Sequence, residues 1–135
     1  MLRISKLADY ASLIMCKIAA SELPAMSATD IAAKTDINLP TVRKILKQLL
    51  AAGLLSSERG AVGGYHLSKS IGDISVANIV EAIDGPLALT DCAHPTRACA
   101  FHKGCQIKDN WQVINVEVKK ALMAVSLAQL AKRGG

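Results

Sequence analysis

The sequence predicts a mainly α-helical protein with one small β-hairpin. Apolar residues make up 51% of the chain, most of them alanine, leucine, isoleucine and valine, and aromatic residues only 3%. In several segments the apolar residues recur every three or four positions, which is the spacing of one helix face. Two short stretches on either side of a glycine-rich segment are typical of a hairpin. At 135 residues, the chain fits one domain with an added oligomerisation element.

Three helices are predicted before Gly53. They are about Lys6–Ser21, Ala28–Lys34, and a third helix that is capped by Asn38 or Leu39 and runs to Ala52. Ser5 and Ser27 precede the first two, and a serine hydroxyl can accept hydrogen bonds from the free N–H groups at a helix start. Pro40 lies in the first turn of the third helix, where its missing N–H costs nothing. Because only a tight turn separates the second helix from the third, the two are expected to form a helix-turn-helix unit.

The third helix has an apolar side and a basic side. Its apolar positions recur at helical spacing and are Leu39, Val42, Ile45, Leu46, Leu49 and Leu50. The remaining faces carry Thr41, Arg43, Lys44, Lys47 and Gln48. A basic side can be no more than a solvated surface, but it is also what a recognition helix presents to the major groove of DNA.

A β-hairpin follows the third helix. Its predicted strands are Leu54–Glu58 and Gly64–Leu67, and its tip contains several glycines that allow close approach to another backbone. A hairpin directly after a recognition helix is a wing. Residues 1–85 are therefore predicted to form a winged helix-turn-helix domain that binds double-stranded DNA. The candidate DNA contacts are Thr41, Arg43, Lys44, Lys47, Arg59 and Tyr65.

The charge of the chain is consistent with a nucleic-acid partner. The formal net charge is +5, of which residues 1–70 supply +4 and residues 71–135 supply +1. A basic small domain favours a polyanion, and nucleic acid before membrane. Asp9 and Lys17 interrupt the apolar run near the N-terminus, so a signal peptide is not expected and a cytoplasmic location is. No catalytic set of residues is evident, which predicts neither an enzyme nor a small-molecule substrate.

Three of the four cysteines are concentrated in residues 86–106, which we call the cysteine segment. Their spacing is Cys92-x6-Cys99-x5-Cys105, wider than the close pairs of a structural zinc site. Such spacing suits an iron–sulfur cluster, although zinc, or unpaired or disulfide-bonded cysteines, are alternatives. In the cytoplasm thiols stay reduced, which favours metal or redox chemistry over structural disulfides. Cys16, in the first helix, is interpreted as a small buried hydrophobe.

The C-terminal part of the chain is predicted to be helical. Ser75 can cap a helix over Val76–Ile83, and a long helix begins between Lys103 and Asp109 and ends near Val125. Its apolar stripe consists of Ile107, Trp111, Ile114, Val118, Leu122 and Val125. The stripe can pack on its own domain, but its length favours contact with a second copy. Residues 107–135 are therefore interpreted as a dimerisation helix with a last short helix capped by Ser126 and a frayed tail.

The chain resembles the IscR/NsrR/RirA family of bacterial winged-helix regulators that carry iron–sulfur clusters. The matching stretches are the opening LRISKLADYA at residues 2–11, LLAAGLL at residues 49–55, the wing RGxxGGYxL at residues 59–67, and the cysteine segment with its following helix. The opening and the cysteine segment resemble those of the regulators of the Suf cluster-assembly operon. The resemblance implies a homodimeric repressor held by crossed long helices. It also implies a cluster on Cys92, Cys99 and Cys105 that controls operator affinity.

One position departs from this family pattern. IscR-type members have a histidine three residues after the third cysteine, where this chain has Lys108, and a protonated lysine has no free lone pair for a metal. The candidates for the fourth ligand are Asp9, His94 and His102. Asp9 matches the carboxylate that NsrR-type members supply from the partner subunit, so the resemblance favours it. Either a 2Fe-2S or a 4Fe-4S cluster is compatible with this ligand set.

Two other functions are compatible with the residues alone. A zinc-stabilised or thiol-based regulator would keep the winged helix but contain no cluster. A cluster carrier or electron-transfer protein would need the cysteines but neither the basic helix nor the wing.

Overall fold

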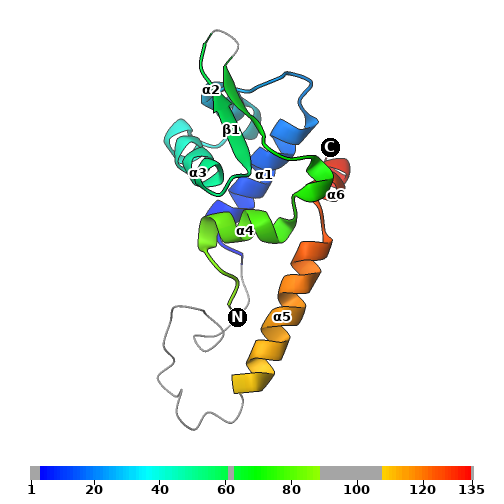
Figure 1. The fold of residues 1–135 in the computed structure, drawn as a ribbon. Coiled ribbons are helices and arrows are strands. Elements are labelled where there is room, and N and C mark those ends of the chain that lie inside the picture. The colour runs from blue at the N-terminus through cyan, green and yellow to red at the C-terminus, as the bar shows by residue number, and fades with distance from the viewer. Residues whose placement is uncertain (1–3, 61–62, 89–107, 135) are drawn as a thin grey trace.

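The computed structural model in Figure 1 describes residues 4–60, 63–88 and 108–134. A head of short helices and a hairpin occupies one end of the molecule, and one long helix extends from it (Figure 1). None of the helices in these three ranges is long and apolar enough to cross a membrane. The predicted fold class, mainly α with a small β-hairpin, is confirmed.

The first three helices begin where the sequence predicts. They are α1 (Lys6–Ala20), α2 (Ala28–Thr35) and α3 (Leu39–Ala51). The C-terminal end of each helix differs from the predicted one by a single residue. At each start a side-chain oxygen accepts a backbone N–H three residues later, and the caps are Ser5, Ser27 and Asn38. These local bonds satisfy donors that a helix start leaves free.

The second strand of the hairpin is hydrogen-bonded along both of its edges. Strands β1 (Leu55–Glu58) and β2 (Gly64–Leu67) pair antiparallel with Leu55 opposite Leu67. On the other edge of β2, Tyr65 and Met26 exchange two backbone hydrogen bonds of 2.7 and 3.0 Å. Gly64 has φ +147°, and a Cβ there would come within 2.6 Å of the Met26 backbone. The absence of a side chain at Gly64 is what allows this close approach.

The core of the head lies between α1, α3 and α4 (Val76–Asp84). Helical spacing of the apolar residues predicts that the buried face of α1 consists of Leu7, Tyr10, Ala11, Ile14 and Ile18. Of these, Leu7 and Tyr10 are only partly buried, whereas Ala8 and Met15, which lie outside the predicted face, are fully buried. In α3 the completely buried residues are Val42, Ile45, Leu46 and Leu49, all on the predicted apolar side. This burial directs the opposite side of α3 to solvent.

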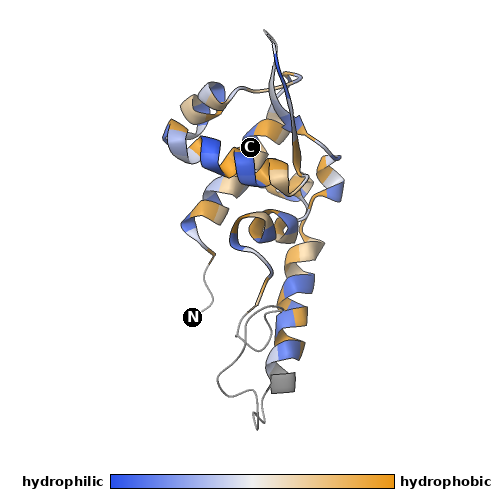
Figure 2. Ribbon diagram, turned by 60° about the vertical axis from the view of Figure 1, so that its left-hand side comes forward, coloured by the Kyte–Doolittle hydropathy of each residue, from blue (hydrophilic) through white to orange (hydrophobic). Residues whose placement is uncertain are grey.

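The C-terminal elements return to the head. After a short 3-10 turn, η1 (Ile71–Asp73), come α4, α5 (Lys108–Ala124) and α6 (Leu127–Gly134). The fully buried Leu127 side chain anchors α6 in the core of the head beside α1. The tail after Lys132, expected to fray, is helical up to Gly134. Figure 2 shows hydrophobic residues in α5 as well as in the head, although α5 extends away from it.

Candidate functional site

The outer side of α3 carries exposed positive charge. Arg43, Lys44 and Lys47 are exposed, and Thr41 is half-buried. None of the three cations forms an ion pair with another residue in the described ranges. Because their charges are not neutralised within the head, they are available to phosphate or base acceptors. The structure thus places four of the predicted DNA contacts on one solvent-facing helix.

The hairpin packs against this helix. Strand β1 contacts α3, and Figure 1 shows the hairpin rising beside it. Arg59, directly after β1, is exposed. Tyr65 is half-buried and packs against the core, and its backbone forms the bonds to Met26. Arg59 is therefore placed to contact a ligand, whereas Tyr65 also has a part in supporting the wing.

Gln48 is a further polar residue on the outer side of α3 that was not among the predicted contacts. It lies one turn after Lys44 and is half-buried. Its Oε1 atom is shielded from solvent and has no hydrogen-bond partner in the described part of the chain. A glutamine amide can recognise a base edge. The i, i+4 spacing from Lys44 is the signal that could have identified Gln48 in the sequence.

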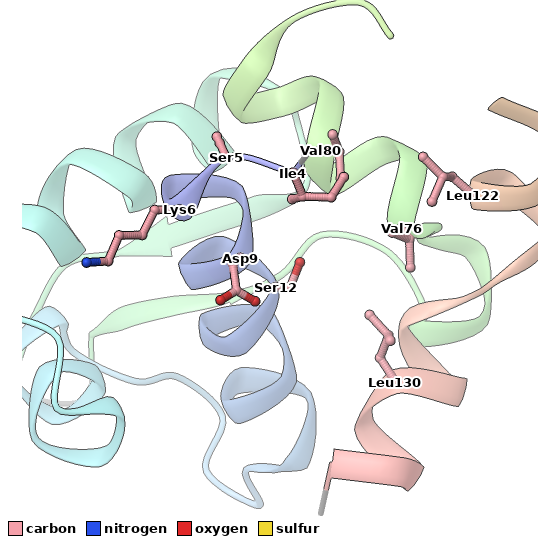
Figure 3. Close-up of a pocket in the computed structure, with 9 residues that line it drawn as sticks. All are labelled: Ile4, Ser5, Lys6, Asp9, Ser12, Val76, Val80, Leu122 and Leu130. Carbon is pink, nitrogen blue, oxygen red and sulfur yellow. The ribbon is translucent and has the colours of Figure 1, made fainter. Parts of the chain in front are cut away.

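Asp9 lies in a groove between the head and α5. The groove has a volume of about 610 Å³ and is lined by Ile4, Ser5, Lys6, Asp9, Ser12, Val76, Val80, Leu122 and Leu130. The Asp9 side chain is exposed, and no residue of the described ranges gives it a hydrogen bond or an ion pair. Lys6 instead lies over the Tyr10 ring at 5.7 Å, and Figure 3 shows Lys6 and Asp9 pointing in different directions. Asp9 thus presents a carboxylate without a described side-chain partner to the groove, although an acid in the first turn of a helix also complements the positive end of the helix dipole.

The other predicted cluster ligands, Cys92, Cys99 and Cys105, and the alternatives His94 and His102, lie outside the described residues. Within residues 4–60, 63–88 and 108–134, no three histidine, cysteine or acidic side chains gather as a metal site. One contact connects the start of α1 with the end of α4, two residues before the cysteine segment begins. The Ser5 hydroxyl donates a hydrogen bond of 2.6 Å to Asp84, the last residue of α4.

Cys16 has the environment of a structural residue. It is half-buried against the core, and burial raises the pKa of its thiol, an effect that Lys17 partly offsets. Metal binding requires the thiolate. A raised pKa therefore agrees with the interpretation of Cys16 as a small hydrophobe.

A helix-turn-helix with a basic outer side and an adjoining hairpin defines a winged-helix, DNA-binding class of protein. Over residues 4–133 the sequence matches the Rrf2 family, described as "Iron-dependent Transcriptional regulator". The chain belongs to the Rrf2 family and is an IscR-like transcriptional regulator.

Several curated sequences are similar to this chain. The regulator IscR of Vibrio atlanticus is 26% identical over 97% of this chain and 76% of its own length. An HTH-type regulator of Mycobacterium tuberculosis H37Rv is 31% identical over 96% of this chain and 81% of its own. A regulator of Azotobacter vinelandii is 30% identical, and the match spans 65% of its length. These relatives are transcriptional regulators, which confirms that the chain is not an enzyme.

Solved structures show the same fold. CymR, the global cysteine regulator of Bacillus subtilis, is 27% identical, has a TM-score of 0.78, and the match covers 98% of each chain. IscR of T. potens is 24% identical with a TM-score of 0.72, covering 99% of this chain and 89% of its own. The fold of this chain therefore occurs both in an IscR and in a cysteine regulator.

Proposed function

We propose that this regulator is a cytoplasmic repressor whose operator affinity depends on an iron–sulfur cluster, and that it governs genes for cluster assembly. The DNA-binding part of this proposal rests on the outer side of α3. There Arg43, Lys44 and Lys47 are exposed and form no ion pair within the described ranges. IscR relatives and the three-cysteine pattern support the cluster part. In a dimer, two α3 helices would enter successive major grooves about 34 Å apart. Arg59 of each wing would enter the neighbouring minor groove.

Arg43→Ala is expected to weaken operator binding by about 1–3 kcal/mol if Arg43 contacts a base, with relaxed specificity at that base. A phosphate contact would weaken binding to all sequences alike. The measurement is binding of a fluorescent operator duplex at moderate salt, with thermal unfolding to confirm an intact fold. Lys17→Ala is the matched control, because Lys17 is an exposed cation on α1. Equal affinity for Arg43→Ala and Lys17→Ala would contradict DNA reading by α3.

The proposed cluster ligands are Cys92, Cys99, Cys105 and Asp9. Thiolates are preferred iron–sulfur ligands, and the cluster would supply a centre sensitive to iron, oxygen or nitric oxide. The open groove beside Asp9 and the absence of a described partner for its carboxylate fit a residue that can donate oxygen to a metal. A carboxylate is a weaker ligand for iron–sulfur iron than a thiolate, so this bond would be the easiest to lose.

Asp9→Ala is expected to retain the fold and the dimer but to change the visible spectrum of the cluster and its effect on operator binding. Mixed dimers locate the ligand. When one chain carries Asp9→Ala and the other Cys99→Ala, ligation across the dimer leaves one cluster with all its ligands and a wild-type spectrum. If all ligands come from one chain, neither cluster of the mixed dimer has its full set of ligands, and no wild-type spectrum is expected. An unchanged spectrum in the Asp9→Ala homodimer, with a changed one in His102→Ala, would assign the ligand to His102.

The proposed homodimer uses the exposed apolar side chains of α5. In the predicted stripe, Val118, Leu122 and Val125 are half-buried, and Leu122 lines the groove together with α4 and α6. Part of this stripe therefore packs on its own head. On the opposite face of the helix, Val113, Met123 and Val116 are exposed by 62%, 56% and 50%. We assign the partner contact to this face, and not to the predicted stripe, which also contains Trp111 and Ile114.

The similarity to a cysteine regulator favours one alternative, a thiol-based regulator of the same fold without a cluster. A regulator of the same fold that binds zinc in place of the cluster is a second alternative. Absorption and metal content of anaerobically purified protein separate the three cases, because zinc and free thiols have no visible absorption.

A further inference from the structure

Helix α5 is fixed to the head at its C-terminal end by backbone hydrogen bonds. The Val76 N–H donates to Val125 O at 2.9 Å, and the Leu127 N–H donates to Ile74 O at 2.7 Å. These two bonds flank Ser126 and join the end of α5 to the start of α4. A helix held only at one end can still change its angle, so further contacts along α5 must define its direction.

Two side-chain contacts provide this second attachment. Lys119 Nζ lies 3.0 Å from Glu81 Oε1, and Asn115 Nδ2 donates a hydrogen bond of 2.9 Å to Leu87 O. At 1.5 Å per residue, Lys119 lies about 9 Å along the helix from Val125. Both acceptors belong to α4 or to the residues directly after it. The angle between α5 and α4 is thus defined by charged and polar contacts as well as by packing.

Lys119 is the ion-pair partner of Glu81. The Glu81 side chain is 29% exposed, but its Oε1 atom is shielded from solvent. A shielded carboxylate oxygen without a nearby cation is unfavourable. Lys119 is the cation that forms an ion pair with Glu81, and other described residues provide none. Helix α4 in turn packs against both α1 and α3. Helix α4 therefore links the Glu81–Lys119 pair to the helix that carries Arg43.

We propose that the Glu81–Lys119 pair fixes the angle between α5 and the recognition helix α3, and thereby sets the half-site spacing that the dimer accepts. This inference rests on the proposed dimeric, operator-binding function. In such a dimer the two heads are joined through α5. A small rotation of α5 on α4 therefore moves the two α3 helices relative to each other, and they no longer match grooves at a fixed separation. Glu81 and Lys119 act as positioning residues and need not touch DNA.

The experiment measures operator affinity as a function of half-site spacing. A site is first selected with the wild-type protein, and duplexes with spacers one or two base pairs shorter or longer are then prepared. The proteins are wild type, Lys119→Met, Glu81→Gln, the exchanged pair Glu81→Lys with Lys119→Glu, and Lys17→Met as a charge-matched control. Sedimentation confirms that each is dimeric.

Wild type and Lys17→Met are expected to prefer one spacing. In Lys119→Met and Glu81→Gln, the ratio of affinities between the preferred and altered spacings should fall about two- to fivefold, the factor expected for one partly exposed ion pair. The exchanged pair should restore the ratio. Wild-type spacing preference in both single variants would overturn the inference while leaving DNA binding intact. If wild-type protein selects no site at all, the proposed function itself fails.

Discussion

Cys99→Ala is expected to abolish the visible absorption of the anaerobically purified protein and its bound iron and sulfide. A cluster held by three thiolates and one weak carboxylate loses a principal ligand in this variant, and the remaining donors would not retain it. Cys92→Ala and Cys105→Ala should give the same result. The measurement is the absorption spectrum together with iron and acid-labile sulfide content per chain.

Cys16→Ala is the matched control for these variants. Its thiol is half-buried in α1, and burial raises its pKa, so little thiolate is available there at neutral pH. The variant should contain as much cluster as wild type. A full cluster in Cys99→Ala, or its loss in Cys16→Ala, would show that the cluster has other ligands.

Val116→Glu is expected to dissociate the proposed homodimer. Val116 belongs to the exposed apolar face of α5, where a partner helix would bury the new carboxylate without a counter-ion. The cost is about 3 kcal/mol or more, which corresponds to a rise in the dimer Kd of about a hundredfold or more. Operator affinity should fall with it, because each head alone contacts only one half-site. Sedimentation equilibrium over a range of concentrations measures the change.

Leu23→Glu provides the control for the dimer experiment. Leu23 lies in the turn between α1 and α2 and is 57% exposed. The substitution therefore introduces the same charge at a similarly exposed apolar position away from α5. It should remain dimeric. A dimeric Val116→Glu protein would move the interface to another surface of the molecule.

The local features of this fold could be predicted from the sequence. Ser5, Ser27 and Ser75 each cap the helix that they were predicted to cap, because a capping bond spans only three residues. The hairpin could be predicted from its glycines, because they too act locally, at the turn between two neighbouring strands. The prediction of which face of α1 is buried was less accurate. Ala8 and Met15 are fully buried and Leu7 only partly, since the packing of α4 and α6 decides which face is covered.

Contacts between distant parts of the chain could not be predicted. Leu127 enters the core of the head from the far end of the sequence, and Gly64 lies against the Met26 backbone. Leu127 has no local sequence signal, and the glycines of the hairpin indicate a close approach to another backbone but not that Met26 is the partner. The same applies to the candidate site. Exposure of Arg43 follows from helical spacing, whereas the place of Asp9 in a groove depends on how α1, α4 and α5 are assembled.

The most direct test of cluster-controlled DNA binding is operator affinity measured for cluster-containing and cluster-free protein, side by side, without oxygen and at one salt concentration. Coupling between two sites in a protein commonly changes affinity about fivefold to 150-fold, and we expect the two Kd values to differ within this range. The cluster-free form should equal Cys99→Ala in affinity. Equal Kd values for the two forms of wild-type protein, both dimeric and both specific for the operator, would contradict control by the cluster.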